Sequence, residues 1–229
     1  MDELKKESRR RADRLRRKFE ALGEPLSWFE AIYAEASGEP RLVPWGHMEA
    51  RFPLVNWLEN QTPDVLSGRA LDIGCGLGDN AMVLADAGFD VTAFDISETA
   101  VKWASKRFPV PSITWRSANL LDPPAEWTEA FDLVSETFTI QALKGRDRTR
   151  AFEGLPNFVK PGGRLLIVAR GRLEDEPINP PPWPLTNSEL DGLEHFGLKS
   201  IAREEYFDKK DPPQRHFLAE FIKPTLNAV

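Results

Sequence analysis

The fold is decided by residues 71–80, which read Leu71-Asp72-Ile73-Gly74-Cys75-Gly76-Leu77-Gly78-Asp79-Asn80. The apolar run from Arg69 to Ile73 predicts a buried strand, and a helical pattern begins directly after the third glycine. Glycine has no Cβ and tolerates positive φ, so the chain can turn tightly here against a ligand. Asp72 adds a carboxylate beside this turn, and Cys75 is expected to pack within it against the ligand rather than act as a nucleophile.

The next strand-like run extends from Phe89 to Phe94 and is followed by Asp95. An acidic residue at the end of the second strand can bind both hydroxyls of a ribose. In a parallel sheet this carboxylate lies at the same edge as the glycine turn. The two features together predict a nucleoside site at the carboxyl ends of parallel strands.

Two nucleoside cofactors compete for this site. The dinucleotide fingerprint Gly-x-Gly-x-x-Gly needs a third glycine for close packing of helix on strand. That position is Asp79 when counted from Gly74 and Ala81 when counted from Gly76, which disfavours an NAD-dependent oxidoreductase. The pattern Asp-x-Gly-x-Gly-x-Gly instead resembles motif I of the class I S-adenosylmethionine-dependent methyltransferases. The resemblance implies S-adenosyl-L-methionine as cofactor and S-adenosyl-L-homocysteine as product.

Composition narrows the class of protein. Of the 229 residues, 41% are hydrophobic and 29% charged, as in a globular protein. The net charge is −6, but residues 1–20 hold nine basic against five acidic residues, so the remainder carries −10. An acidic body argues against a nucleic-acid partner. One cysteine, a charged N-terminus and no long apolar segment predict a cytoplasmic protein without a membrane partner; the oligomeric state stays open.

From residue 69 onward the chain alternates strand and helix, which predicts an α/β fold with a doubly wound sheet. Expected strands are 69–73, 89–94, 112–116, 131–136, 163–169, 198–206 and 214–222. Expected helices are 2–22, 26–37, 48–60, 79–87, 98–107, 146–159 and 186–195. The order resembles the seven-stranded, Rossmann-like methyltransferase sheet, mostly parallel with a C-terminal antiparallel hairpin. Residues 1–62 are expected to form a helical cap or lid on a methyltransferase domain of residues 63–229.

Methyl transfer from a sulfonium requires alignment of the nucleophile, exclusion of water and aromatic faces near the methyl group. Trp45 belongs to no obvious helix face, so it either stacks near the cofactor or fills the core under the cap. His47 has an ordinary pKa near 6.5 and is a candidate general base, or else a structural loop residue. Glu136, at the end of the fourth strand, is expected to be a site residue. These three residues are candidates for catalysis or cofactor contact.

Further candidates lie beyond the fourth strand. Arginines at 146, 148 and 150 begin a predicted helix, where positive charge opposes the helix dipole. They therefore suggest a ligand or carboxylate partner, or else a solvated helix end. Arg170 directly follows the predicted fifth strand, so we expect it to border the opening of the same site. The stiff segment Pro180–Leu185 is interpreted as a wall of the substrate pocket or as a plain connector.

Further motifs outside the glycine turn resemble one branch of the methyltransferases. Pro44-Trp45, Gln141-Ala142-Leu143 with Arg148, Val159-Lys160-Pro161-Gly162-Gly163 and the proline-rich loop before Leu185-Thr186 resemble the thiopurine S-methyltransferase and thiol/halide methyltransferase branch, over residues 25–222. The resemblance implies cofactor contacts from Trp45, Gly74, Gly76, Asp95, Ile96 and Glu136, and a place near the substrate for Arg148. Gly78 is expected to contact the cofactor as the third glycine of the turn. Asn119 would bind the adenine amino group, with Leu120 packed on the ring. Ser135-Glu136-Thr137 departs from the thiopurine pattern.

We therefore expect an enzyme that methylates a small molecule by in-line SN2 transfer, preferably a thiol, selenol, halide or similar soft nucleophile. Soft nucleophiles need little help from a general base. Two alternatives stay open. The first is an O- or N-methyltransferase in which His47 or Glu136 takes the proton. The second is a module that binds adenosylmethionine without catalysis. No metal site is expected, because the histidines are far apart in sequence.

Overall fold

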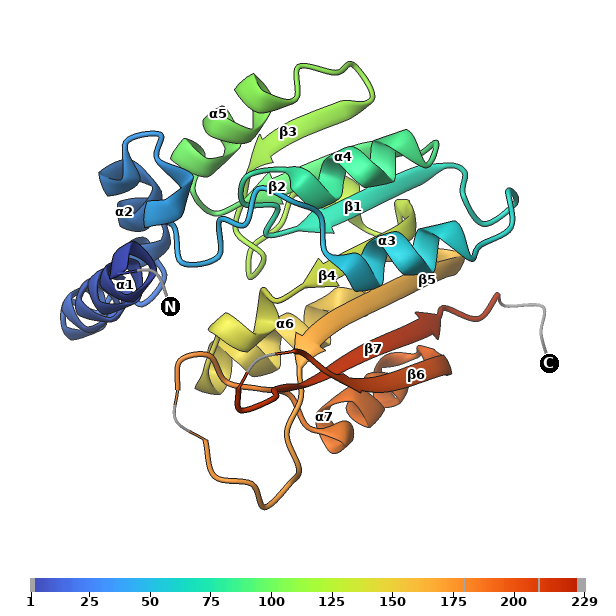
Figure 1. Ribbon diagram of the computed structural model, residues 1–229. Coiled ribbons are helices and arrows are strands. Elements are labelled where there is room, and N and C mark those ends of the chain that lie inside the picture. The colour runs from blue at the N-terminus through green and yellow to red at the C-terminus, as the bar shows by residue number, and fades with distance from the viewer. Residues whose placement is uncertain (1–2, 179, 210, 226–229) are drawn as a thin grey trace.

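The computed structural model describes residues 3–178, 180–209 and 211–225 (Figure 1). These residues form a seven-stranded sheet in the order β3-β2-β1-β4-β5-β7-β6. The strands are β1 (Arg69–Ile73), β2 (Asp90–Asp95), β3 (Ile113–Ser117), β4 (Phe131–Thr137), β5 (Val159–Arg170), β6 (Lys199–Phe207) and β7 (Arg215–Ile222). β1 to β5 are parallel, whereas β7 is antiparallel to both of its neighbours. The expected fold class is confirmed.

Helices cover both faces of the sheet. They are α1 (Glu3–Ala21), α2 (Ser27–Ala36), α3 (Phe52–Glu59), α4 (Asp79–Asp86), α5 (Glu98–Arg107), α6 (Gly145–Phe158) and α7 (Asn187–Asp191). Short 3-10 helices are η1 (Pro40–Leu42), η2 (Ala125–Trp127), η3 (Ile140–Ala142) and η4 (Gly192–Phe196). α3 and α4 bury their apolar faces on one side of the sheet, and α6 and α7 on the other (Figure 1). Successive residues of β5 alternate between these two cores, as a strand buried on both faces requires.

Three elements differ from the sequence expectation in extent. The helix expected over 186–195 is α-helical only from Asn187 to Asp191 and continues as the 3-10 helix η4. The third helix begins at Phe52 rather than at residue 48, because Met48 has a φ of 58° and Pro53 favours the first helical turn. β5 begins at Val159, so the Pro161-Gly162-Gly163 segment lies within the strand. A Cβ at Gly163 would meet the Phe131 carbonyl oxygen at 2.8 Å, and the pairing register shifts beside it. The glycines therefore permit an irregular strand instead of closing a turn.

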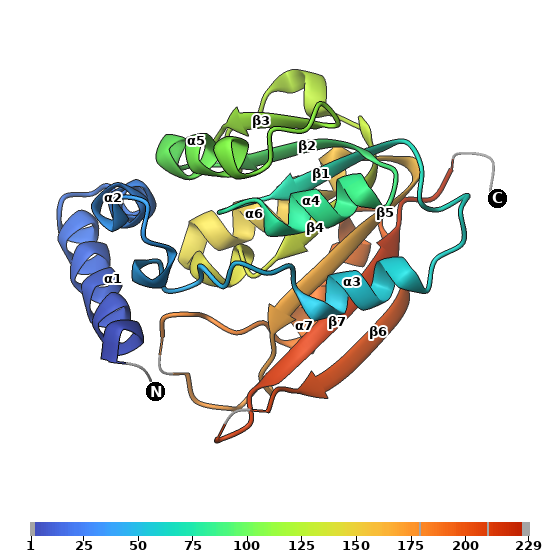
Figure 2. The same ribbon diagram turned by 45° about the horizontal axis from the view of Figure 1, so that its top comes forward.

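α1, α2 and the loop after η1 share a third apolar cluster of their own, which includes Leu15, Ile32 and Tyr33. The cluster reaches Leu77 in the glycine turn and Ala100 in α5. Figure 2 shows α1 and α2 beside the ends at which the parallel strands stop, an edge that we call the carboxyl edge. The N-terminal helices thus pack where the predicted nucleoside site lies.

A carboxylate fixes this arrangement. Glu30 of α2 accepts hydrogen bonds from the Ser97 hydroxyl at 2.6 Å and the Thr99 amide at 3.1 Å, and it also bonds to the Thr99 hydroxyl. Ser97 is the N-cap of α5 and lies two residues beyond Asp95, the last residue of β2. α2 is therefore attached to the same turn that carries Asp95.

Candidate active site

The glycine turn has the backbone that the sequence predicts. Gly74, Gly76 and Gly78 all have positive φ, at 64°, 53° and 89°. A Cβ at Gly74 would lie 2.3 Å from the Thr139 Oγ1, and one at Gly78 would lie 2.6 Å from the Trp115 ring. Side chains at these positions would be strained in conformation and in space. The turn therefore presents bare backbone at the carboxyl edge.

Asp95 ties the turn to the end of β2. Its carboxylate accepts hydrogen bonds from the Gly76 amide at 3.0 Å and the Ser97 amide at 2.9 Å. Burial raises the pKa of Asp95 to about 6, although the amides of Ser97 and Gly76 favour the charged form. Ile96 follows, partly buried, beside it. The predicted ribose-binding carboxylate and the glycine turn are therefore in direct contact.

Two more buried carboxylates lie at the same edge. Asp72 on β1 pairs in register with Ser135 on β4, next to Glu136. Burial raises the pKa of Asp72 to about 8, with smaller contributions from the charges of Asp95 and Glu136. Glu136 Oε1 accepts hydrogen bonds from the amides of Thr139 at 2.6 Å and Ile140 at 2.9 Å, and burial raises its pKa to about 7.

Each of these two carboxylates keeps one unsatisfied oxygen. Among the described residues, Asp72 Oδ2 and Glu136 Oε2 are buried and have no hydrogen-bond partner. Such atoms are rare in folded proteins because desolvation without a partner is costly. Three buried acidic groups around a bare backbone turn form a site that suits a cationic ligand.

Trp45 contacts this site indirectly, through the hydroxyl group of Tyr33. Its indole Nε1 donates to the Tyr33 hydroxyl at 2.6 Å, and its ring meets Trp28 and Phe29 edge-on. The Tyr33 hydroxyl in turn lies 3.0 Å from the position of a Cβ at Gly76. Burial raises the pKa of Tyr33 well above its ordinary value, with a further contribution from the charge of Asp95.

Cys75 is buried in the turn, and burial raises the pKa of its thiol. Asn119 lies just past β3, where its Oδ1 accepts a hydrogen bond from the Leu121 amide at 2.9 Å. That oxygen has a second lone pair, so binding of adenine by Asn119 stays a prediction. Leu120 is partly buried against the apolar core behind the sheet.

The two other catalytic candidates, His47 and Arg148, differ in their surroundings. His47 is exposed and lines a cavity of about 280 Å³ together with Lys5 and Arg41. Arg148 is buried and forms a two-pronged ion pair with Glu189, at 2.7 and 2.8 Å, while also donating to the Trp183 carbonyl oxygen at 2.8 Å. Its guanidinium thus holds the proline-rich loop, and its charge lowers the pKa of Glu136. The roles proposed for both residues stay predictions.

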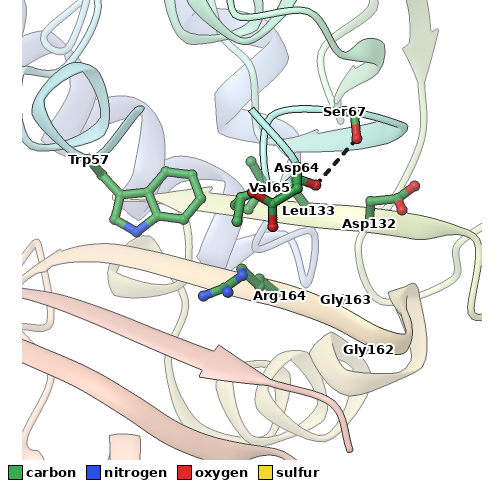
Figure 3. Close-up of a pocket in the computed structure, with 9 residues that line it drawn as sticks. All are labelled: Trp57, Asp64, Val65, Ser67, Asp132, Leu133, Gly162, Gly163 and Arg164. Carbon is green, nitrogen blue, oxygen red and sulfur yellow. Dashed lines mark hydrogen bonds between the residues drawn. The ribbon is translucent and has the colours of Figure 1, made fainter. Parts of the chain in front are cut away.

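A further cavity, of about 170 Å³, lies at the opposite edge of the sheet (Figure 3). Its charged groups have protein partners. Arg164 pairs with Glu220, which also accepts a hydrogen bond from the Trp57 indole at 3.0 Å. Asp132 accepts a hydrogen bond from the Arg69 amide at 2.8 Å and pairs with Lys160. Ligands of open α/β sheets bind at the carboxyl edge, so we assign no ligand to this cavity.

Comparison with known proteins agrees with this geometry. Residues 70–163, which span the glycine turn, Asp95 and β4, match the family described as a methyltransferase domain. The chain is an S-adenosylmethionine-dependent methyltransferase. Its cofactor is S-adenosylmethionine and its acceptor is a small molecule, as the sequence predicts. No helix in the described ranges is both long and apolar enough to cross a membrane.

Relatives of the methyltransferase differ in their described substrates. The chain is 29% identical over 172 residues to "Probable thiol methyltransferase 2" of Arabidopsis thaliana, which covers 73% of this chain and 74% of the relative. It is 27% identical over 163 residues to a "Ubiquinone biosynthesis O-methyltransferase" of Xanthomonas oryzae, covering 70% of this chain but only 59% of that relative. These two similarities leave the acceptor atom undecided.

Solved structures share the fold of the methyltransferase. The N-methyltransferase NodS from Bradyrhizobium japonicum, solved with S-adenosylhomocysteine, aligns with a TM-score of 0.65 at 19% identity, covering 85% of this chain and 97% of that one. A Burkholderia thailandensis 1,6-didemethyltoxoflavin-N1-methyltransferase aligns with a TM-score of 0.69 at 16% identity, covering 91% and 90%. At these identities the likeness bears on the fold alone.

The residues of the site fit the cofactor of this class. Adenosylmethionine carries a sulfonium and an ammonium group, and the unsatisfied oxygens of Asp72 and Glu136 are acceptors without a partner among the described residues. At Gly74 and Gly78 the space that a Cβ would need is taken by Thr139 and Trp115, so the turn can form only with glycine at these positions. Sequence reasoning missed Tyr33 and Glu30, which join the site from α2, because their helix is read as an ordinary apolar-faced helix.

Proposed function

We propose that the methyltransferase acts on a small soft nucleophile, with a thiol as the preferred acceptor. The observation that carries this proposal is the surroundings of His47, which is exposed and lines a cavity with Lys5 and Arg41 rather than with Asp72, Asp95 or Glu136. Thiols deprotonate near neutral pH and need little help from a base. Relatives in Arabidopsis thaliana described as "Probable thiol methyltransferase 2" and "Thiocyanate methyltransferase 1" support the same class of acceptor.

In this proposal the residues of the chain bind and position. Asp95 holds the ribose hydroxyls, and Asp72 and Glu136 face the cationic part of the cofactor. The bound cofactor supplies an electrophilic methyl group. The proline-rich loop, held by Arg148, excludes water from the acceptor pocket, which favours attack by the intended nucleophile over hydrolysis.

A second candidate is methylation of an oxygen or nitrogen acceptor. Glu136 favours it, because a carboxyl group with a pKa of about 7 and one unbonded oxygen is suited to accept a proton near neutral pH. The relative described as a ubiquinone biosynthesis O-methyltransferase is consistent with this candidate.

Formation of S-adenosylhomocysteine from a panel of small acceptors tests both candidates. The panel contains aliphatic and aromatic thiols, iodide, phenols and primary amines, each with a no-enzyme control. We expect the highest kcat/KM with thiols, and a Glu136→Gln variant should retain thiol methylation at saturating S-adenosylmethionine. An enzyme that is silent with thiols and active with phenols would overturn the preferred acceptor. If the protein binds the cofactor but methylates none of these acceptors, the result would favour a module that binds adenosylmethionine without catalysis.

A further inference from the structure

Two half-buried arginines at the carboxyl edge form no ion pair with any residue that the structure describes. Arg107, Arg148 and Arg164 pair with Asp79, Glu189 and Glu220 respectively. Arg51 and Arg170 differ, because among the described residues neither guanidinium forms an ion pair. Arg51 donates to the Trp45 carbonyl oxygen at 3.4 Å and lies 5.2 Å from the Phe138 ring centre. The side chain of Arg170 makes no hydrogen bond within the same described ranges.

The two charges lie close together in a desolvated place. Burial lowers the pKa of both guanidinium groups, and nearby positive charge lowers each pKa further, that of Arg9 for Arg170 and that of Arg170 for Arg51. Among the acidic groups, Glu49 acts most strongly on Arg51, but it is exposed and forms no ion pair with Arg51 within the described ranges. Asp79, which acts on Arg51, is already held by both prongs of Arg107, while Asp208, which acts on Arg170, accepts the Gln214 amide across its hairpin. Burial of unpaired positive charge is costly unless an anion binds there.

The arginines lie beside the reacting end of the site. Arg170 is the last residue of β5, on the same face as Val168 and next to the end of β4. Arg51 lies over the ring of Phe138, which is two residues beyond Glu136. The Phe138 amide donates a hydrogen bond to the Val168 carbonyl oxygen at 2.9 Å, and this bond holds Phe138 in place. Phe138 has a φ of 62°, a conformation that side chains rarely adopt and that is common at functional sites.

Aromatic groups complete this surface. His216 is the cross-strand partner of Arg170. Its ring stacks on Tyr206 at 5.2 Å and meets Phe138 edge-on at 5.8 Å. Two guanidinium groups beside three flat rings provide hydrogen-bond donors for an anionic group and an apolar wall for the carbon skeleton that carries it.

We propose that Arg170 and Arg51 recognise an anionic group on the methyl acceptor, so that the substrate is a small organic acid whose nucleophilic atom is separate from its carboxylate or sulfonate. The inference rests on the proposed function in placing the acceptor at this edge, but not on whether sulfur, oxygen or nitrogen is methylated. A guanidinium without a protein partner discriminates an anion from a neutral isostere, because the neutral group leaves the buried charge uncompensated.

Calorimetric titration with a matched pair of probes tests this inference. The probes are 3-(methylsulfanyl)propionate and its neutral amide, titrated into the protein with and without saturating S-adenosylhomocysteine. We expect the carboxylate to bind at least about 10-fold more tightly than the amide, as charge-assisted hydrogen bonds predict. Arg170→Gln should remove this preference, and Arg170→Lys should keep part of it. Arg51→Gln should weaken the carboxylate alone.

Arg69→Gln is the matched control, since Arg69 also lies over a phenylalanine ring, at 4.9 Å from Phe131, but at the opposite edge of the sheet. It should leave both titrations unchanged. Equal affinity for carboxylate and amide, no binding of the carboxylate, or equal loss of both probes in Arg170→Gln would each overturn the inference. Failure of S-adenosylhomocysteine to bind would instead count against the proposed function, while the titrations without it still report on the arginines.

Discussion

Asp95 is the residue with the most defined task, because both of its oxygens are already oriented. The amides of Gly76 and Ser97 hold the carboxylate at the junction of the glycine turn and α5. A carboxylate that is fixed before the ligand arrives loses little conformational freedom on binding. Its hydrogen bonds to a ribose should therefore contribute nearly their full strength.

Replacement of Asp95 by alanine should weaken cofactor binding more than any change on the surface of β2. Loss of charge-assisted hydrogen bonds at about 1.5 to 3 kcal/mol each predicts an increase in the Kd for S-adenosylhomocysteine of at least about 10-fold. Isothermal titration calorimetry measures this directly. Asp90→Ala, an exposed aspartate at the other end of the same strand, is the control. Equal affinities of Asp95→Ala and Asp90→Ala would contradict the assignment.

At the residue scale, sequence reasoning succeeds where the chain position alone determines the neighbours. Asp72, Asp95 and Glu136 all lie at the ends of neighbouring parallel strands, so their meeting follows from topology. Tyr33 and Arg51 come to the same edge from helices or loops whose docking depends on tertiary packing. No local spacing in the sequence encodes that docking, which is why their contacts were not predicted.

At the scale of elements, Arg148 joins the start of α6 to the loop that precedes α7. It binds both oxygens of Glu189 and the Trp183 carbonyl oxygen. The Thr186 amide donates to the same Glu189, in a capping box that begins α7. The sequence pattern indicates that this arginine needs a partner, but the partner is 41 residues away and only the fold identifies it.

Arg148→Leu should release the proline-rich loop. Glu189 would lose its ion-pair partner, and the carbonyl oxygens of Ile140, Trp183 and Pro184 would lose the Arg148 donor. The expected cost is about 2 to 3 kcal/mol in the free energy of unfolding, reduced because Glu189 is partly exposed. Urea denaturation measures the loss, and limited proteolysis should cleave within residues 171–185. Arg150→Leu is the control, since Arg150 on the same helix is exposed and donates to the Leu121 carbonyl oxygen. An unchanged loop in Arg148→Leu would refute this role.

At the scale of the whole molecule, three carboxyl groups lie buried at the carboxyl edge of the cofactor-free protein. Burial disfavours the charged form of each of them. The pKa of Asp95 is raised to about 6, that of Glu136 to about 7 and that of Asp72 to about 8. The folded protein therefore binds more protons than the unfolded chain from about pH 4 upward. Stability must fall as pH rises through this window.

We expect the melting temperature of the cofactor-free protein to decrease between about pH 5 and pH 8. Asp72→Asn should flatten this dependence, because the neutral amide cannot ionise in the buried site. S-adenosylmethionine should also reduce it, since positive charge beside the carboxylates favours their ionised form. Differential scanning calorimetry across this range provides the test, with Asp86→Asn on exposed α4 surface as control. A melting temperature that increases with pH in the same window would contradict the assigned pKa values.

The contact between Gly74 and Thr139 has a consequence for redesign of the enzyme. The Thr139 hydroxyl donates to the Ile73 carbonyl oxygen at 3.0 Å and fills the space above the glycine. Residues 136–140 therefore support the glycine turn of the cofactor site, although they border the surface that we propose for the methyl acceptor. Libraries that aim to retarget the enzyme to new acceptors should leave this segment intact and diversify the arginine and aromatic positions beyond it.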